Sequence, residues 1–288
     1  QQVLIREVAQ SGKPLILVLL NGRPLDLSWE STVADAIVEA WYPGTEGGHA
    51  VADVLSGDFN PCGKLTMTFP RNLGQVPIHY DAKNTGRPYT PGQGEQHYVS
   101  RYLNEPTATP LYPFGYGLSY TTFTRTVESF DFDGETVTEK VTVKNTGDVQ
   151  GKEVVTVFVE APQGKLGKAA RSLAAFAKTD TLQPGESETL TLTFPIANLA
   201  SYDDSGVTGH RFCYVLESGT YNVYTGGCVR CAKLSGSFEV KEDTVTRTCV
   251  QACAPVTKFD RMVNHNNTIA FEPAPQREYD MAARSAAA

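Results

Sequence analysis

Two closely spaced pairs of cysteines are the residues of this sequence whose type and spacing are best suited to binding a metal. They occur as Cys228-x-x-Cys231 and Cys249-x-x-x-Cys253, among six cysteines in all. This spacing is loosely that of a four-thiolate zinc site, and the same residues could instead form disulfides. We favour free thiols, which persist in a reducing compartment and so predict a cytoplasmic, bacterial protein. Zinc and disulfides stay open as alternatives.

A carboxylate lies in the glycine-rich turn Gly44-Thr45-Glu46-Gly47-Gly48. Helix N-termini attract carboxylates, so Glu46 could serve acid chemistry, but a structural role in the turn is the favoured interpretation. The glycine spacing differs from that of a dinucleotide fingerprint, which also requires an acidic residue about 20 positions further on. The histidines show no ligand spacing, which favours structural or surface roles (His49, His79, His97, His210 and His265). The sequence therefore predicts no cofactor.

Composition and charge restrict the classes of partner. The chain has 288 residues, of which 41% are hydrophobic and 20% are charged, and this is the composition of a folded protein of about two domains. The net charge is −7, from 25 basic and 32 acidic residues without a basic cluster, which disfavours nucleic acid and anionic membranes. The longest apolar run, Leu15–Leu20, is far shorter than the roughly 20 residues of a membrane span.

The first part of the chain alternates between predicted strands and helices. Apolar spacing predicts a helix over Gln1–Gln10, strands over Leu15–Leu20 and Ala36–Trp41, a helix capped by Thr45 and closed by Gly57, and a third strand over Leu65–Phe69. Such alternation is typical of an α/β sandwich with a mostly parallel sheet, and so few elements predict a truncated one. Because Gln1 is not Met and the chain opens directly in a helix, we expect a cut through a larger polypeptide, with a processed terminus as the alternative.

The second part of the chain has the two-residue period of strands. Valines alternate with polar residues over Val137–Lys144, and similar segments follow the turns at Asn145–Asp148 and Gln183–Glu186. About seven such strands predict an antiparallel β-sandwich. We therefore expect an α/β domain over residues 1–80, an aromatic and proline-rich connector over 81–118, the sandwich over 119–241, and an irregular extension over 242–288. Within that extension, Arg247–Val256 is predicted to form a short helix.

Several long segments resemble glycoside hydrolase family 3 in the order that the family has them. Gly44–Gly48 and Ala52–Pro70 resemble its C-terminal α/β domain, and Asn84–Tyr89 and Tyr112–Tyr120 resemble its connector. Lys144–Gly147 and Gln183–Ser187 resemble turns of its fibronectin type III-like domain. The resemblance extends over about residues 1–240, and the remaining tail occurs in only some members.

The resemblance implies a β-glucosidase-like, exo-acting enzyme that retains configuration at the cleaved sugar. Such hydrolysis needs two carboxyl groups about 5–5.5 Å apart. In the family, the nucleophile is an Asp on an N-terminal (β/α)₈ barrel and the acid/base is a Glu that precedes the helix with which this chain opens. No segment here resembles either motif, so we expect no catalytic residue in this chain and place both carboxylates upstream of Gln1.

Three residues of the connector are candidates for contact with the sugar. Asn84 and Arg87 could hydrogen-bond sugar hydroxyls, and Tyr89 could stack on a sugar face. Their place in the family's connector makes the rim of the active site one interpretation and contact with the barrel another. For Tyr112, Phe114 and Tyr116, packing between domains is the prediction.

Two hypotheses of different classes follow. In the first, the chain is the C-terminal portion of a family 3 hydrolase, whose partners are the missing barrel and the rest of the α/β domain, an oligo- or aryl β-glycoside substrate, and a second copy in a homodimer. In the second, it is a non-catalytic structural or carbohydrate-interaction module, or one half of a split enzyme. An incomplete sheet favours the first, because its open edges and apolar helix faces need cover.

Overall fold

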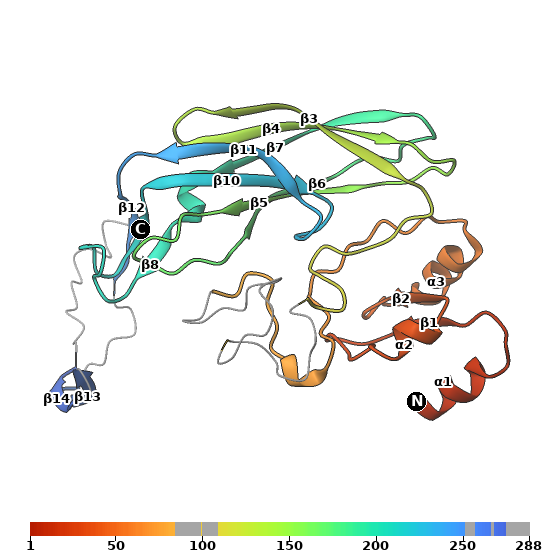
Figure 1. Ribbon diagram of the computed structural model, residues 1–288, viewed down its shortest axis with the longest axis horizontal. Helices are drawn as coiled ribbons and strands as arrows, with labels where there is room; N and C mark the ends of the chain where they lie inside the picture. Colours follow the sequence, from red (N-terminus) through yellow and green to blue (C-terminus); the bar gives the residue numbers. More distant parts are fainter. Residues whose placement is uncertain (84–98, 100–108, 251–256, 266–267, 275–288) are drawn as a thin grey trace. The chain divides into compact units, whose positions relative to one another are not determined.

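The computed structural model describes residues 1–83, 99, 109–250, 257–265 and 268–274 (Figure 1). The chain divides into two compact units, which are described separately. The first unit comprises Gln1–Ser201 and Leu216–Thr244, and the second comprises Tyr202–Val215 and the chain from Val245 onward. In the described ranges, no helix combines the length and the apolar character that crossing a membrane requires.

The first unit opens with a small helix–strand layer. It consists of α1 (Gln2–Ala9), β1 (Ile16–Leu19), α2 (Glu30–Val33), β2 (Ala36–Glu39), α3 (Gly47–Ser56) and the short 3₁₀ helix η1 (Leu73–Gln75). Strands β1 and β2 pair in parallel, from Ile16 with Ala36 to Leu19 with Glu39, which confirms the prediction of a parallel sheet. Helix α3 begins one residue later than predicted, because Glu46 rather than Thr45 is its N-cap residue. Gly57 closes it at φ 87°, a conformation that glycine adopts without strain.

The predicted third strand, Leu65–Phe69, is not a strand of this sheet. Its backbone pairs with the connector instead: the Leu65 amide donates to the Tyr116 carbonyl at 2.8 Å, and the Phe69 amide donates to the Tyr112 carbonyl at 2.9 Å. Phe69 and Tyr112 form an isolated antiparallel bridge. The prediction was wrong because an apolar run identifies a buried extended segment but does not identify its hydrogen-bonding partner.

A β-sandwich of two antiparallel sheets completes the first unit (Figure 1). One sheet has the order β3-β4-β7 and the other has the order β11-β10-β5-β6. Their bounds are β3 (Phe123–Phe132), β4 (Thr136–Asn145), β5 (Val154–Glu160), β6 (Ser172–Lys178), β7 (Ser187–Pro195), β10 (Gly219–Gly226) and β11 (Lys233–Val240), with the 3₁₀ helix η2 (Ile196–Leu199) after β7. This arrangement confirms the predicted sandwich, although β6 was not among the strands read from the alternation.

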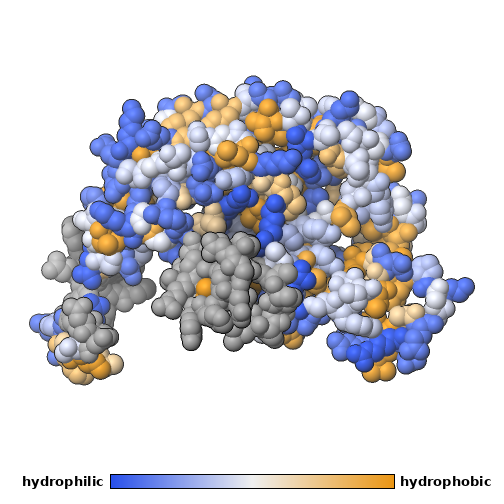
Figure 2. Space-filling model, viewed as in Figure 1, coloured by the Kyte–Doolittle hydropathy of each residue, from blue (hydrophilic) through white to orange (hydrophobic). Residues whose placement is uncertain are grey.

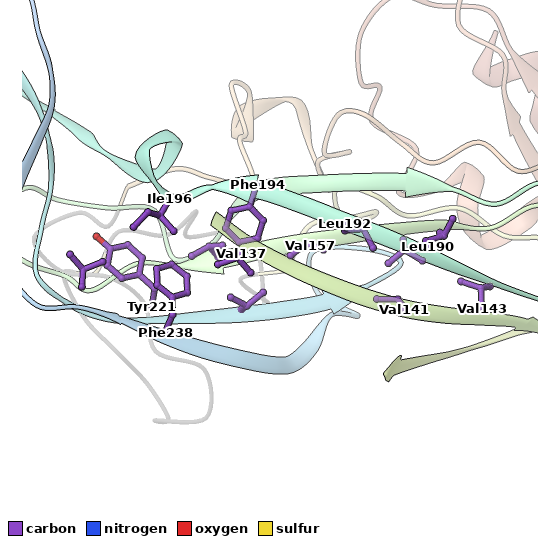
Figure 3. Close-up of a cluster of buried hydrophobic side chains, with 14 of the residues drawn as sticks. Val137, Val141, Val143, Val157, Leu190, Leu192, Phe194, Ile196, Tyr221 and Phe238 are labelled. Carbon is purple, nitrogen blue, oxygen red and sulfur yellow. The ribbon is translucent and has the colours of Figure 1, made fainter. Parts of the chain in front are cut away.

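The core of the sandwich lies between the inner faces of the two sheets (Figure 3). Val141 of β4 and Val157 of β5 are fully buried, and Tyr221 stacks on Phe238 with ring centroids 5.1 Å apart. The Tyr221 hydroxyl donates to the Glu217 carbonyl at 2.8 Å, so its one polar group is paired inside the core. Burial of each such aliphatic side chain contributes about 1.5–3 kcal/mol, which makes the sandwich the stable part of this unit.

The second unit is built of strands, and its C-terminal strands lie where the sequence suggested irregular chain or helix. Strands β8 (Ser201–Asp203), β9 (Cys213–Leu216) and β12 (Thr244–Thr248) form one sheet in the order β12-β9-β8. Strands β13 (Asp260–His265) and β14 (Thr268–Pro273) form an antiparallel hairpin. The predicted helix over Arg247–Val256 is wrong at its start, because Arg247 and Thr248 belong to β12, while residues 251–256 lie outside the described part. Alternating threonines in Thr244–Thr248 favour a strand, since β-branched residues lose side-chain freedom in a helix.

A single buried carboxylate organises the loop between β8 and β9. Asp203 has no exposed surface, and its two oxygens accept six hydrogen bonds, from the amides and hydroxyls of Ser205 and Thr208 and the amides of Gly206 and Val207. Burial by itself raises the pKa of Asp203, but these hydrogen bonds outweigh it and hold the pKa far below its usual range. The loop therefore depends on the charged form of this side chain.

This dependence predicts a pH-sensitive contribution of Asp203 to stability. A lowered pKa in the folded state stabilises the fold fully above the unfolded-state pKa of about 3.9, and the contribution is lost as pH falls below that value. We expect Asp203→Asn to expose the Ser205–Thr208 amides to faster hydrogen exchange at pH 7 and to reduce the change in exchange between pH 6 and pH 3. Asp180→Asn, at an exposed carboxylate, is the matched control. Equal exchange rates in both variants would contradict the role of Asp203.

Candidate functional site at the connector

The residues predicted to contact sugar cannot be placed. Asn84, Arg87 and Tyr89 lie outside the described residues, so their role stays a prediction. Glu46 is described: its carboxylate contacts His49 Nδ1 at 2.7 Å, and both side chains are largely exposed. The structural role favoured for Glu46 in the turn stays a prediction.

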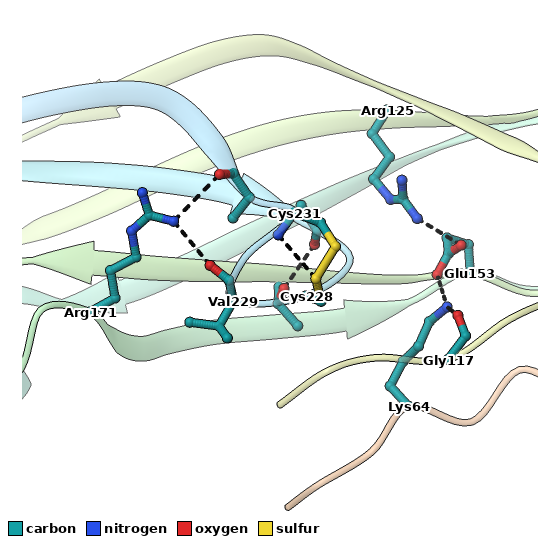
Figure 4. Close-up of a disulfide and its surroundings, with 11 residues drawn as sticks. Lys64, Gly117, Arg125, Glu153, Arg171, Cys228, Val229 and Cys231 are labelled. Atoms are coloured by element: carbon teal, nitrogen blue, oxygen red, sulfur yellow. Dashed lines mark hydrogen bonds and ion pairs between the residues drawn. A yellow bond between two sulfur atoms is a disulfide. The ribbon is translucent and has the colours of Figure 1, made fainter. Parts of the chain in front are cut away.

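Cys228 and Cys231 form a disulfide, with their Cα atoms 5.0 Å apart (Figure 4). The amides of Cys231 and Ala232 both donate to the Cys228 carbonyl, at 3.1 and 3.0 Å, and this tight turn brings the two sulfurs together. The prediction of free thiols is therefore wrong for this pair, and the pair cannot supply zinc thiolates. Cys62, Cys213 and Cys249 are free, while Cys253 lies outside the described residues. Across the described ranges, no three His, Cys, Asp or Glu residues are grouped to hold a metal.

A buried carboxylate joins the helix–strand layer to the sandwich. Glu153, 5% exposed, accepts Lys64 Nζ at 3.1 Å on one oxygen and Arg125 Nη2 at 2.7 Å on the other (Figure 4). Lys64 lies between α3 and the extended segment Leu65–Phe69, Arg125 lies on β3, and Glu153 immediately precedes β5. Lys64 Nζ also donates to the Gly117 carbonyl of the connector at 3.0 Å. One negative charge thus fixes three separate segments to one another.

A second polar contact fixes the same boundary. The Asn60 side-chain oxygen accepts the Tyr120 amide at 2.8 Å and the Ser119 hydroxyl at 3.0 Å, and its amide nitrogen donates to the Gln150 carbonyl at 2.9 Å. The Tyr120 hydroxyl donates to the Val54 carbonyl of α3 at 2.7 Å. The start of the sandwich, directly after the connector, is therefore hydrogen-bonded to the helix–strand layer.

The aromatic residues of the connector pack between these parts, as predicted. Phe114 stacks on Tyr80 with centroids 4.2 Å apart, and both rings meet the edge of Phe158 from β5. Tyr112 stacks on Tyr116 at 5.0 Å and contacts Phe69 at 6.3 Å. The connector thus supplies apolar packing as well as hydrogen bonds at the boundary.

A cavity of about 840 Å³ lies beside this aromatic cluster, within the first unit. Tyr80 and Phe114 line it together with charged and polar side chains from the sandwich, among them Glu160, Arg171 and Arg230. Its size and its mixture of apolar and polar groups are those of a small-molecule site. It is the candidate binding site of the described residues.

Two buried oxygens without partners lie at the carboxyl edge of the parallel strands. Asn21 Oδ1, just after β1, and Glu39 Oε2, at the end of β2, have no hydrogen-bond partner among the described residues. Burial raises the pKa of Glu39, while two hydrogen bonds to its carboxylate lower it, one from the Trp41 amide to Oε1 and one from the Asn21 side chain. Ligands and active sites of open α/β sheets form at this edge, so it is where further protein or a ligand could complete the layer.

Comparison with known proteins identifies the two domains. Residues 1–120 match the glycosyl hydrolase family 3 C-terminal domain, and residues 153–228 match the fibronectin type III-like domain. The chain is 44% identical over 246 residues to the periplasmic β-glucosidase of Salmonella typhimurium, covering 83% of this chain and 31% of that protein. It is 38% identical over 288 residues to a β-glucosidase of Ruminococcus albus, covering 99% of this chain and 30% of that protein.

A solved structure shares the fold. The β-glucosidase of Paenibacillus barengoltzii superposes with a TM-score of 0.74 at 33% identity, over 98% of this chain and 32% of that chain. The protein therefore combines a family 3 glycoside hydrolase C-terminal domain with a fibronectin type III-like domain, as the sequence motifs suggested. The chain spans about a third of the length of the relatives that it matches.

Several residues of this site were not found from the sequence. Lys64 lies inside a motif that pointed to the family, yet its partners Arg125 and Glu153 carry no local signal. Arg171 follows a stretch without regular pattern, and its orientation depends on carbonyls some 60 positions away. Only Phe114 and its aromatic neighbours were identified correctly, because dense aromatics imply burial.

We expect Glu153→Gln to destabilise the first unit strongly. Removing one partner of a buried ion pair leaves the opposite charge unpaired, which costs about 3–5 kcal/mol of stability. Because the Arg125 side chain is 28% exposed and partly hydrated, we expect a loss near the lower end of this range. Urea unfolding measures the difference in free energy of unfolding.

Glu128→Gln is the matched control, since Glu128 is an exposed carboxylate on β3. The control should change the free energy of unfolding by less than about 0.5 kcal/mol. If Glu153→Gln behaved like this control, the Lys64–Glu153–Arg125 cluster would not hold the boundary together.

Proposed function

We propose that this chain is the C-terminal portion of a retaining, exo-acting family 3 glycoside hydrolase with β-glucosidase-like activity. The observation that carries the proposal is the ordered match to both C-terminal domains, in a chain that spans about a third of its β-glucosidase relatives. The proposal includes the domain boundaries: the α/β domain over 1–80, the connector over 81–118, the sandwich over 119–241 and the extension over 242–288.

The catalytic pair lies outside these 288 residues. In the described lining of the cavity beside the connector, Glu160 is the one carboxylate, whereas retention requires two about 5–5.5 Å apart. We place the nucleophile Asp on a barrel, and the acid/base Glu in the rest of the α/β domain, upstream of Gln1. In this arrangement, the chain contributes one wall of the active site and the sandwich supports it. The connector residues Asn84, Arg87 and Tyr89 contact the terminal sugar from the rim.

The surface of the helix–strand layer supports a missing partner. Apolar side chains are exposed on and beside α1, the two short strands and α3: Val3, Leu4, Ile16, Leu20, Tyr42, Leu55 and Phe59. Figure 2 shows hydrophobic groups at the surface of this layer. The unpartnered oxygens of Asn21 and Glu39 belong to the same layer. A two-stranded sheet is too small to be stable alone, and the rest of the domain would pair its edges and cover these groups.

The disulfide alters the expected compartment. The prediction of a cytoplasmic protein depended on free thiols, and Cys228–Cys231 removes that support. Disulfides persist in oxidising compartments, and the Salmonella relative is a periplasmic enzyme. We therefore propose an extracytoplasmic location for the parent hydrolase.

The test compares this chain with its parent polypeptide. We expect the 288-residue chain alone to release no nitrophenol from p-nitrophenyl β-D-glucopyranoside, while the parent does so and leaves the α-anomer intact. Sequencing the flanking reading frames locates the barrel. Turnover by the purified chain would contradict the placement of both carboxylates elsewhere, and a barrel found downstream would contradict their placement upstream.

A parent without any glycosidase activity would favour the alternative, a non-catalytic carbohydrate-interaction or structural module. One half of a split enzyme would instead regain activity when mixed with a separately encoded barrel.

A further inference from the structure

The cavity beside the connector carries an orientated cation. Arg171 Nη1 donates to the Val229 carbonyl at 3.0 Å and reaches the Ala232 carbonyl at 3.5 Å (Figure 4). The centre of the Tyr224 ring lies 3.7 Å from the guanidinium carbon of Arg171. The ring and the two carbonyls hold the guanidinium in place. Its Nε and Nη2 groups have no hydrogen-bond partner among the described residues, so the fixed cation still has donors to offer.

The disulfide turn adds a second arginine. Arg230 lies between Cys228 and Cys231, and the closed turn directs both Val229 and Arg230 to the wall of the cavity. The Val229 amide donates to the Phe114 carbonyl at 3.2 Å, so this turn is attached to the aromatic wall. Arg230 forms no ion pair or hydrogen bond with a described residue. Partial burial lowers its pKa, but an arginine remains charged near neutrality.

An acceptor lies in the same cavity. Glu160 Oε2 accepts the Tyr224 hydroxyl at 2.9 Å, which orients the carboxylate and leaves Oε1 without a hydrogen-bond partner among the described residues. The carboxylate is an acceptor for hydroxyl protons, beside the two arginines that supply only donors. Donors and acceptors placed together match the hydroxyls of a neutral sugar, each of which donates and accepts.

The opposite wall is aromatic and rigid. The Tyr80–Phe114 stack is held by Phe158 behind it, and the Tyr80 hydroxyl accepts the Leu173 amide at 3.1 Å. A fixed aromatic pair offers apolar contact with little loss of side-chain freedom on binding. Apolar contact on one side and hydrogen bonds on the other are what the two faces of a sugar ring require.

We propose that this cavity is a binding site for a neutral oligosaccharide, with Arg230 and Arg171 as donors, Glu160 as acceptor and Tyr80–Phe114 as the apolar wall. The ligand class rests on the proposed function, because it is the class of substrate that a β-glucosidase-like parent would meet.

The experiment is calorimetric titration of the 288-residue chain with laminaritetraose and cellotetraose, with sodium glucuronate and inorganic phosphate as anionic probes. We expect one saturable site for a neutral tetrasaccharide. Arg230→Ala should weaken it about tenfold, the loss of one charge-assisted hydrogen bond, without changing the melting temperature. Glu160→Gln should weaken it as well. Arg23→Ala, at an exposed arginine of the helix–strand layer, is the matched control and should bind as the unaltered chain does.

The outcomes separate this inference from the proposed function. No binding of either tetrasaccharide, equal affinity in Arg230→Ala and Arg23→Ala, or binding of the anions alone would overturn the proposed binding site, whatever the parent hydrolyses. Binding with the expected loss in Arg230→Ala would support the site even if the parent released no nitrophenol, a result that would count against the proposed function alone.

Discussion

The boundary between the two domains depends on one buried carboxylate. Glu153 forms ion pairs with Lys64 on one side and Arg125 on the other, in surroundings where an unpaired charge would be costly. Lys64 also binds the connector, and the segment that follows it pairs with the connector's backbone. Because the aromatic cluster and the cavity lie along this same connector, their geometry depends on the docking that Glu153 maintains.

The cavity illustrates how a site can arise at such a boundary. No single element supplies it: the aromatic wall comes from Tyr80 and Phe114, the acceptor from the end of β5, and the cations from the loops before β6 and after β10. These side chains are held by contacts within the protein that can stay in place when a ligand binds. Tyr224, for example, packs its ring against Arg171 and donates its hydroxyl to Glu160. Preorganisation of this kind lowers the cost of binding.

The two parts of the first unit differ in how complete they are. The sandwich closes its own core, from Val141 to Tyr221, and its polar core hydroxyl finds a partner within the same sheet region. The helix–strand layer instead leaves apolar residues such as Leu4 and Leu20 exposed, and its parallel sheet has only two strands among the described residues.

The sequence alone determined the elements whose period or turn chemistry is local: the valine alternation of β4, the parallel strands at Leu15–Leu20 and Ala36–Trp41, the glycine that ends α3, and the motifs of the family. Only the tertiary structure decided which segments pair across long separations. Leu65–Phe69 was expected in the parallel sheet and pairs with the connector, and Cys228 was expected as a free thiol and is bonded to Cys231. The roles of Glu153 and Arg171 could not be predicted from the sequence, because they depend on partners that lie far away along the chain and meet only on folding.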